Sequence, residues 1–328
     1  MRDLAARTRS GLAAKAVRPS RVDPRVRVDL AHLRSLEGHA KALSFLPHRK
    51  AGSVLNGRHS SRLRGRGLNF EELRDYLPGD DVRSIDWKVT ARTGEPHVRV
   101  FTEERDRPTL ILLDQRMTMF FGTWHNMKSV TAAEAAALTA FRILDQGDRV
   151  GGIVFGDEAV AEVRPLRNRR RLDAFISAVA AANAALTAEA PAVEPMTLNR
   201  PLEAAARIAR RDHLVLVISD FDGIDQRTET LLGGLARHND VMLCPVTDPS
   251  AHEIPENLRL VFSDGRLQAE LDTATGRTWQ ALSEFSSGRL AQLLDWERRL
   301  GLPVLPLSSG EETVPQVRRL LGLSAGRR

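Results

Sequence analysis

Four acidic residues follow apolar runs of the sequence, where a carboxylate could bind a cation or take part in catalysis. They are Asp114, Asp220, Asp222 and Asp248. Hard cations such as Mg²⁺ prefer carboxylate oxygens, supplemented by hydroxyls and water. Aspartate at this point of a chain also caps helix N-termini by accepting backbone hydrogen bonds. For any one of these acids, its place at the end of an apolar run favours helix capping over metal binding. Whether they can act together depends on the strands and helices that carry them.

From residue 109 onward, apolar runs of strand length alternate with amphipathic stretches. The runs lie at 109–114, 149–157, 213–221, 240–248 and 302–309. Helical spacing predicts helices over 129–146, 169–186, 200–211, 226–238, 278–300 and 313–321. This alternation predicts an α/β fold of three layers, doubly wound around a mostly parallel sheet. Because ligands of such sheets bind at the carboxyl ends of the strands, Asp114 and Asp220 should lie at one edge.

Three further elements complete the predicted fold. Residues 159–166 follow the second run after a short turn and predict an antiparallel edge strand. Residues 258–272 predict a hairpin that turns at 263–265. Near the N-terminus, residues 29–46 have helical spacing, with Asp29 as the predicted cap.

Residues 57–107 differ from the rest, because they are rich in Gly, Arg, Asp and Glu and poor in apolar runs. Charged residues of both signs surround the turn at Pro78 and Gly79: Arg74, Asp80, Asp81, Arg83, Asp86 and Arg92. Near-equal signs favour an ion-pair network that fixes an irregular layer to the sheet, over a docking surface or a catalytic acid cluster. Tyr76 and Trp87 are predicted packing anchors. With so few apolar residues, the segment should pack on the sheet and not form a separate domain.

This segment resembles the family called domain of unknown function 58. The matching residues are Gly57 to Ser61, Gly65 to Gly67, Asn69 to Trp87, Thr90 to Arg92, Val98 to Phe101 and Glu103 to Arg105. The resemblance extends over about residues 30–325 and implies a von Willebrand factor A-like domain, in a short branch without a membrane hairpin. It also implies a bacterial or archaeal protein whose partners are a MoxR-type AAA+ ATPase and an unknown client protein.

Von Willebrand A domains often carry a metal-ion-dependent adhesion site, and the sequence matches its pattern only in part. The resemblance implies Asp114, Thr118, Thr197 and Asp220 as ligands of Mg²⁺. Arg116 replaces the first serine of the pattern, and arginine is permanently charged and has no acceptor. Its guanidinium would repel a dication and could pair with Asp114 or Asp220. We therefore expect no cofactor and weak or absent Mg²⁺ binding, with Arg116 and Asp222 on the rim that meets a partner.

Composition narrows the classes of protein that this chain can belong to. The 328 residues are 42% hydrophobic and 27% charged, which is typical of a globular protein. No apolar run reaches the 18 residues or so that a membrane helix needs, and the single cysteine, Cys244, favours a reducing, cytoplasmic location. The net charge of +6 equals that of residues 1–27. The remainder of the chain therefore has no net charge, and the sequence does not predict that it binds nucleic acid.

We expect three parts: a basic flexible tail over 1–28, an N-terminal helix with the signature segment over 29–108, and the von Willebrand A-like domain over 109–325. The sequence contains no Gly-x-Ser-x-Gly, Walker A, Cys-x-x-Cys or His-Glu-x-x-His motif. This favours a non-enzymatic adaptor that works with the ATPase in chaperone-like assembly or maturation. The alternatives are nucleic-acid tethering by the tail, and a metal-dependent hydrolase that uses acids from among Asp80, Asp81, Asp86, Asp114 and Asp220.

Overall fold

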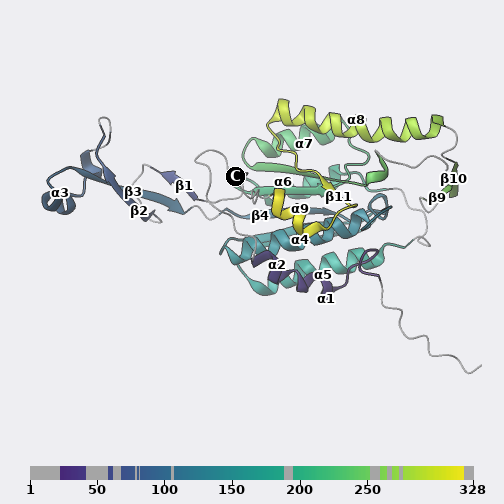
Figure 1. The fold of residues 1–328 in the computed structure, drawn as a ribbon, viewed down its shortest axis with the longest axis horizontal. Coiled ribbons are helices and arrows are strands. Elements are labelled where there is room, and N and C mark those ends of the chain that lie inside the picture. The colour runs from purple at the N-terminus through teal and green to yellow at the C-terminus, as the bar shows by residue number, and fades with distance from the viewer. Residues whose placement is uncertain are drawn as a thin grey trace, which may run out of the picture.

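A six-stranded sheet covered by helices on both faces forms the core of the protein (Figure 1). The computed structural model describes residues 23–41, 58–61, 68–77, 80, 82–104, 107–187, 195–251, 259–263, 268–272 and 276–320. The sheet has the order β11-β8-β7-β4-β5-β6. Its strands are β4 (Thr109–Asp114), β5 (Val150–Phe155), β6 (Val160–Leu166), β7 (Leu214–Ser219), β8 (Asp240–Thr247) and β11 (Leu307–Ser308). The predicted three-layer fold with a mostly parallel sheet is confirmed.

The strands pair in parallel except for β6, which pairs with β5 in the antiparallel sense, as predicted. Every residue of β4, β5 and β7 is buried, which explains why these strands are continuous apolar runs. Gly152 lets the ring of Phe175 pack directly on the backbone of β5, because a Cβ at residue 152 would clash with that ring. The last strand, β11, is shorter than the predicted run over 302–309.

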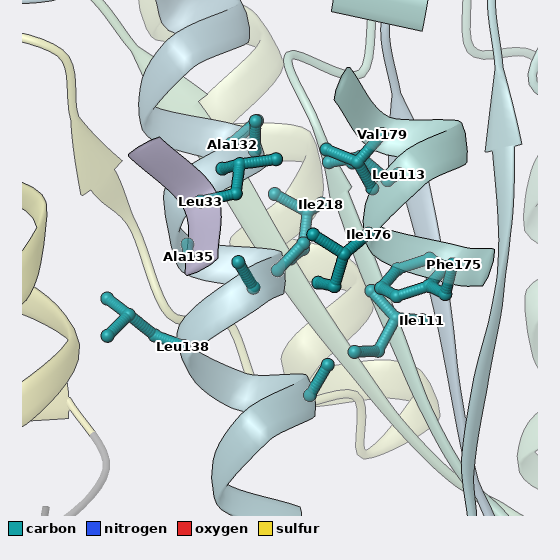
Figure 2. Packing of buried hydrophobic residues seen from close by; sticks show 14 of the residues in the cluster. Leu33, Ile111, Leu113, Ala132, Ala135, Leu138, Phe175, Ile176, Val179 and Ile218 are labelled. Carbon is teal, nitrogen blue, oxygen red and sulfur yellow. The ribbon is translucent and has the colours of Figure 1, made fainter. Parts of the chain in front are cut away.

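Helices cover the two faces of the sheet in separate groups. Among the described residues, the helices that cover the sheet are α4 (Lys128–Asp145), α5 (Arg169–Ala185), α6 (Asn199–Ile208), α7 (Gln226–Ala236), α8 (Gly276–Leu300) and α9 (Thr313–Leu320). Helices α4, α5 and α9 pack on one face, and α6, α7 and α8 pack on the other. Figure 2 shows Ile111 and Ile218 of the sheet packed against Ile176 of α5. The predicted helix positions are confirmed to within a few residues.

The described residues between 58 and 104 include an antiparallel sheet that projects from the core, and we call the segment 58–104 the arm (Figure 1). Its strands are β1 (Arg58–Ser61), β2 (Leu68–Asp75) and β3 (His97–Glu104). Between β2 and β3 lie the 3-10 turn η1 (Val82–Ser84) and the helix α3 (Trp87–Thr93). The prediction of an irregular layer packed on the central sheet is therefore wrong. Backbone hydrogen bonds join β2 to β3 along their length and form a sheet separate from the central one.

Residues 23–41 pack against the core, on helices α4 and α5. They contain two short helices, α1 (Leu30–Ser35) and α2 (Glu37–Lys41), where the sequence predicts one. Asp29 caps α1, as predicted. Val28 is buried, and its backbone N–H donates to Asn183 Oδ1 at 2.8 Å. The predicted flexible tail is thus wrong for residues 23–28, while residues 1–22 lie outside the described residues. The sequence groups the one helix predicted over 29–46 with the signature segment, but its described part packs on the core, and residues 42–46 lie outside the described residues.

Two smaller features complete the described chain. The strands β9 (Arg259–Ser263) and β10 (Gln268–Asp272) form the predicted hairpin, and the turn between them lies outside the described residues. Cys244 of β8 is buried, and this burial raises the pKa of its thiol to about 12, as expected of a core residue. Among the described residues, none of the helices combines the length and the hydropathy required to cross a membrane.

Candidate functional site

Asp114 and Asp220 lie at the same edge of the central sheet, as their positions in the sequence predict. Asp114 is the last residue of β4, and Asp220 directly follows β7. The two strands are parallel neighbours, so their carboxyl ends meet at one edge. Both side chains are buried, which makes an unpaired charge at this edge costly.

Arg116 supplies the positive charge that these two carboxylates require. Its Nε lies 3.1 Å from each oxygen of Asp114, and its Nη2 lies 2.7 Å from Asp114 Oδ2. The same Nη2 lies 3.7 Å from Asp220 Oδ1. Only 2% of Arg116 is exposed, so the guanidinium is enclosed by the fold and does not reach a partner directly. The expectation that it pairs with an acid at this edge agrees with the geometry, whereas its predicted place on an exposed rim does not.

Carbonyl groups accept the remaining hydrogen bonds of the guanidinium. Arg116 Nη1 donates to Met196 O at 2.9 Å, and both terminal nitrogens lie 3.3 Å from Asp222 O. Burial opposes the charged form, but Asp114 outweighs it and raises the pKa of Arg116 above its usual range. The guanidinium therefore stays charged, and its position is fixed from three sides of the site.

Two more cations neutralise the acids that follow β7. Lys128, the first residue of α4, donates to Asp220 Oδ2 at 2.8 Å, and Arg289 of α8 pairs with Asp222 at 2.5 Å. Burial tends to raise the pKa of Asp220, but Lys128 and Arg116 together lower it to about 2. Asp220 is therefore ionised at neutral pH and held by cations of the chain itself.

The two threonines implied as metal ligands do not join this cluster of charges. Thr118 lies in the 3-10 turn η2 (Met117–Met119), and its hydroxyl is buried without a hydrogen-bond partner among the described residues. Thr197 is exposed, and it is the carbonyl of the preceding residue, Met196, that contacts Arg116. In the part of the chain that the structure describes, no group of three His, Cys, Asp or Glu side chains is placed to hold a metal ion.

Sequence reasoning missed two residues of the site. Ser219 donates its hydroxyl proton to Asp114 Oδ2 at 2.6 Å and accepts a hydrogen bond from the Phe221 N–H. Lys128 reaches Asp220 from the start of a helix that lies far away in sequence. The position of Ser219 directly before Asp220 is a signal that could have been used, because it ends the same strand. No local pattern marks Lys128.

Comparison with known proteins places this chain in a family. A family model described as "Protein of unknown function DUF58" matches residues 72–288. The chain belongs to the DUF58 family. The uncharacterized proteins Mb1516 of Mycobacterium bovis and Rv1480 of Mycobacterium tuberculosis are each 32% identical to it over 224 residues. That alignment covers 68% of this chain and 69% of each relative.

Two solved structures resemble this DUF58 chain at low sequence identity. One is the conserved hypothetical protein BatB from Bacteroides thetaiotaomicron, with 12% identity and a TM-score of 0.38 over 66% of this chain and 98% of BatB. The other is the SpRpn10 VWA domain, with 11% identity and a TM-score of 0.36 over 68% of this chain and all of that domain. The family assignment itself rests on the family model and the mycobacterial relatives.

The DUF58 signature segment lies in the arm and contains one of the expected ion pairs. Arg74 binds both oxygens of Asp80 at 2.7 Å, and Asp80 Oδ2 also accepts the Leu77 N–H. Tyr76 OH donates to Asp80 O at 3.3 Å. Asp86 caps α3, Arg83 and Arg92 are exposed, and Pro78, Gly79 and Asp81 lie outside the described residues.

Trp87 is not a packing anchor, because 63% of it is exposed. It is the first residue of α3, at the part of the arm far from the core (Figure 1). The arm leads into β4 at the amino end of that strand, whereas Asp114 lies at its carboxyl end. Asp80 and Asp86 of this DUF58 chain are therefore not in one cluster with Asp114 and Asp220.

A cavity of about 110 Å³ opens beside the cluster, at the same edge of the sheet. Its apolar wall includes Phe121, Pro245, Leu290 and Leu293. Two acids, Asp220 and Asp248, and two cations, Lys128 and Arg289, form its charged side. Since each of these cations already pairs with a carboxylate, the cavity combines an apolar wall with a nearly neutral polar side.

Proposed function

We propose that this DUF58 chain is a non-enzymatic protein-interaction module, an adaptor that presents the carboxyl edge of its sheet to a MoxR-type AAA+ ATPase. Its place would be the cytoplasm, and the work shared with the ATPase would be chaperone-like assembly or maturation of a client protein. The observation that carries this proposal is the buried pairing of Arg116 with Asp114. A guanidinium fixed between two carboxylates gives the edge a charge arrangement that does not depend on a bound ion.

The distribution of acids also supports an adaptor over a metal-dependent hydrolase. Metal-assisted hydrolysis needs several carboxylates that converge on an ion with an open coordination position. Asp114 and Asp220 are engaged by Arg116 and Lys128. The described acids Asp80 and Asp86 lie in the arm. A pair of carboxylates that is neutralised by cations of the same chain suits recognition of a protein surface better than hydrolysis.

A network around Asp248 holds the loops of this edge in place, as a docking surface requires. Asp248 accepts hydrogen bonds from Thr123 N at 2.9 Å, Thr123 Oγ1 at 2.6 Å, Ser250 N at 3.0 Å and Ser309 Oγ at 2.6 Å. These donors come from the loops after β4, β8 and β11. Trp124, next to Thr123, is 64% exposed on this fixed scaffold. Exposed tryptophan on a rigid surface is typical of residues that dominate protein–protein binding.

The test is direct binding of the purified chain to the purified MoxR-type ATPase of the same organism, measured by biolayer interferometry with ATP and with ADP. We expect Trp124→Ala to weaken binding by about tenfold or more. Trp87→Ala is the matched control, since Trp87 has the same residue type and nearly the same exposure but lies in the arm. It should not weaken binding. Absence of binding by the wild type, or phosphate-ester hydrolysis lost on Asp114→Ala, would contradict the proposal.

A further inference from the structure

The tip of the arm, which comprises α3 and the residues just before it, exposes several apolar side chains. None of the seven residues of α3 is buried. Beside the exposed Trp87, Leu77 is 59% exposed and Val82 is 55% exposed. Large apolar side chains gathered on one projecting element are typical of a contact surface for another molecule.

Polar contacts hold the backbone of this tip in place. Asp86 caps α3 by accepting the N–H groups of Lys88 and Val89, and Gly94 ends the helix in the left-handed conformation with φ of 84°. The Asp86 N–H donates to His97 O at 2.8 Å, which ties the start of the helix to β3. The backbone at Trp87 is therefore held in place, and fixing a contact residue in advance lowers the entropy cost of binding.

The charges of the tip are opposite to those of the carboxyl edge of the core. Between Val82 and Glu95 the exposed cations Arg83, Lys88 and Arg92 outnumber the one exposed acid, Glu95, and Asp86 is buried. The loops 156–159, 220–225, 248–251 and 309–312, which follow β5, β7, β8 and β11, contain no Lys or Arg. They contain eight acids: Asp157, Glu158, Asp220, Asp222, Asp225, Asp248, Glu311 and Glu312. With Arg116, Lys128 and Arg289 included, this edge still has more acids than cations, so it attracts a basic tip.

The cavity at that edge has the chemistry that an indole ring requires. Phe121, Leu290 and Leu293 supply apolar contacts, and the aliphatic and charged parts of Lys128 and Arg289 can pack on the face of an aromatic ring. The indole N–H needs an acceptor, and the carboxylate of Asp220 lies in the cavity wall.

We propose that the chain associates head to tail, with Trp87 of one copy inserted into the carboxyl-edge cavity of a second copy. The arm leaves the core at the amino end of β4 and the cavity lies at the carboxyl end of the sheet, so the two surfaces are at opposite ends of the molecule (Figure 1). One copy therefore presents both halves of the contact in different directions. Such a heterologous contact joins further copies into a ring or an open chain.

Self-association would also affect binding of the ATPase. This effect, unlike the association itself, rests on the proposed function. The arm of a second copy and the ATPase would use the same edge of the sheet, so each would exclude the other. Trp87→Ala would then leave more of the edge accessible and strengthen ATPase binding in proportion to the fraction of self-associated chain.

Sedimentation velocity over about 1–100 µM, a range suited to micromolar contacts, tests the association itself. We expect the wild type to form dimers and larger species as concentration rises, and to lose them when salt is raised from about 0.05 to 0.5 M. Trp87→Ala and Leu290→Arg should each weaken association at least tenfold. Leu166→Ala, which truncates a residue 41% exposed on β6, is the matched control and should associate like the wild type.

An equimolar mixture of Trp87→Ala and Leu290→Arg distinguishes this arrangement from a symmetric dimer. The mixture should form a heterodimer and no larger species, because one variant retains the cavity and the other retains the arm. Formation of that heterodimer also shows that both variants fold. Two monomeric variants that do not complement each other, a wild type that stays monomeric throughout, or undiminished association of Trp87→Ala would each overturn the proposal. These outcomes do not depend on the ATPase.

Discussion

At the scale of single residues, Arg116 determines what the carboxyl edge can do. It replaces an exchangeable cation by a fixed one, with bidentate contacts to Asp114 and a 3.7 Å approach to Asp220. A buried ion pair gains little net free energy over an apolar core, but removing one partner leaves an uncompensated charge. Arg116 therefore stabilises this edge mainly by compensating the buried negative charges of Asp114 and Asp220.

Replacing Arg116 by serine should convert the cluster into a magnesium site. We expect Arg116→Ser to lower the free energy of unfolding by about 3–5 kcal/mol, since Asp114 loses its buried partner. Mg²⁺ should then restore part of this stability, because the hydroxyl returns an oxygen ligand and a like charge beside the ion is gone. The measurement is thermal unfolding with and without Mg²⁺, and titration calorimetry with Mg²⁺ and Mn²⁺.

Arg116→Met is the matched control for this change, because it removes the charge without supplying an oxygen. It should lose comparable stability and recover less of it with Mg²⁺. Tight Mg²⁺ binding by the wild type, abolished by Asp114→Ala, would show that Arg116 does not exclude the ion.

At the scale of elements, Glu134 joins three separate segments to helix α4. Its Oε1 lies 2.6 Å from His32 Nε2 of α1, and its Oε2 accepts from Thr313 Oγ1 of α9 at 2.5 Å. Asn126, in the loop before α4, lies 3.4 Å from the same Oε2. The N-terminal segment is thus held to the core partly by a group that titrates near neutral pH.

Docking of residues 23–41 should weaken as pH rises. The hydrogen bond to Glu134 raises the pKa of His32 above its usual value. A raised pKa means that this stabilisation is complete below the unfolded-state pKa of about 6.5 and is lost as pH rises through the folded value. We expect amide protection of residues 23–41, measured by hydrogen exchange and corrected for intrinsic rates, to fall severalfold between about pH 6 and 8.5.

His32→Gln should remove most of that pH dependence. His39→Gln is the control, since His39 is exposed on α2 and should leave the dependence intact. Equal protection of the wild type at both pH values would show that the His32–Glu134 contact does not govern docking.

At the scale of the whole molecule, the arm and the carboxyl edge lie at opposite ends of the core (Figure 1). The ends of the arm are close together, because Arg58 and Glu104 are partners in the antiparallel pairing of β1 with β3. Paired Cα atoms in such a ladder are about 5 Å apart. The arm can therefore be removed without separating the segments that it connects.

Replacing residues 58–104 by a four-residue Gly-Ser linker should leave the core folded. We expect the midpoint of thermal unfolding to change by less than about 5 °C, since the core retains its sheet and both helical layers. Circular dichroism and calorimetry measure this, and sedimentation should show loss of self-association. Failure of the shortened chain to fold would mean that the arm stabilises the core.

The sequence by itself determined the layers, the strands and the edge at which the acids meet. Continuous apolar runs and helical periodicity show which residues will be buried, because apolar side chains face the core of a folded protein. Asp114 and Asp220 could be assigned to one edge because parallel strands end on the same side. The expectation that Arg116 pairs with an acid there followed from its charge and its place beside Asp114.

Only the tertiary structure decided where the arm lies and how the cluster is completed. The sequence predicts that residues 57–107 pack on the sheet, because too few apolar residues are present for a core. In the structure the segment instead forms its own sheet, in which backbone hydrogen bonds join β2 to β3. Trp87 remains exposed. Lys128, Ser219 and the Met196 carbonyl come together at the edge although they are distant in sequence. Such contacts depend on how segments pack in space, and the local pattern of residues does not encode that packing.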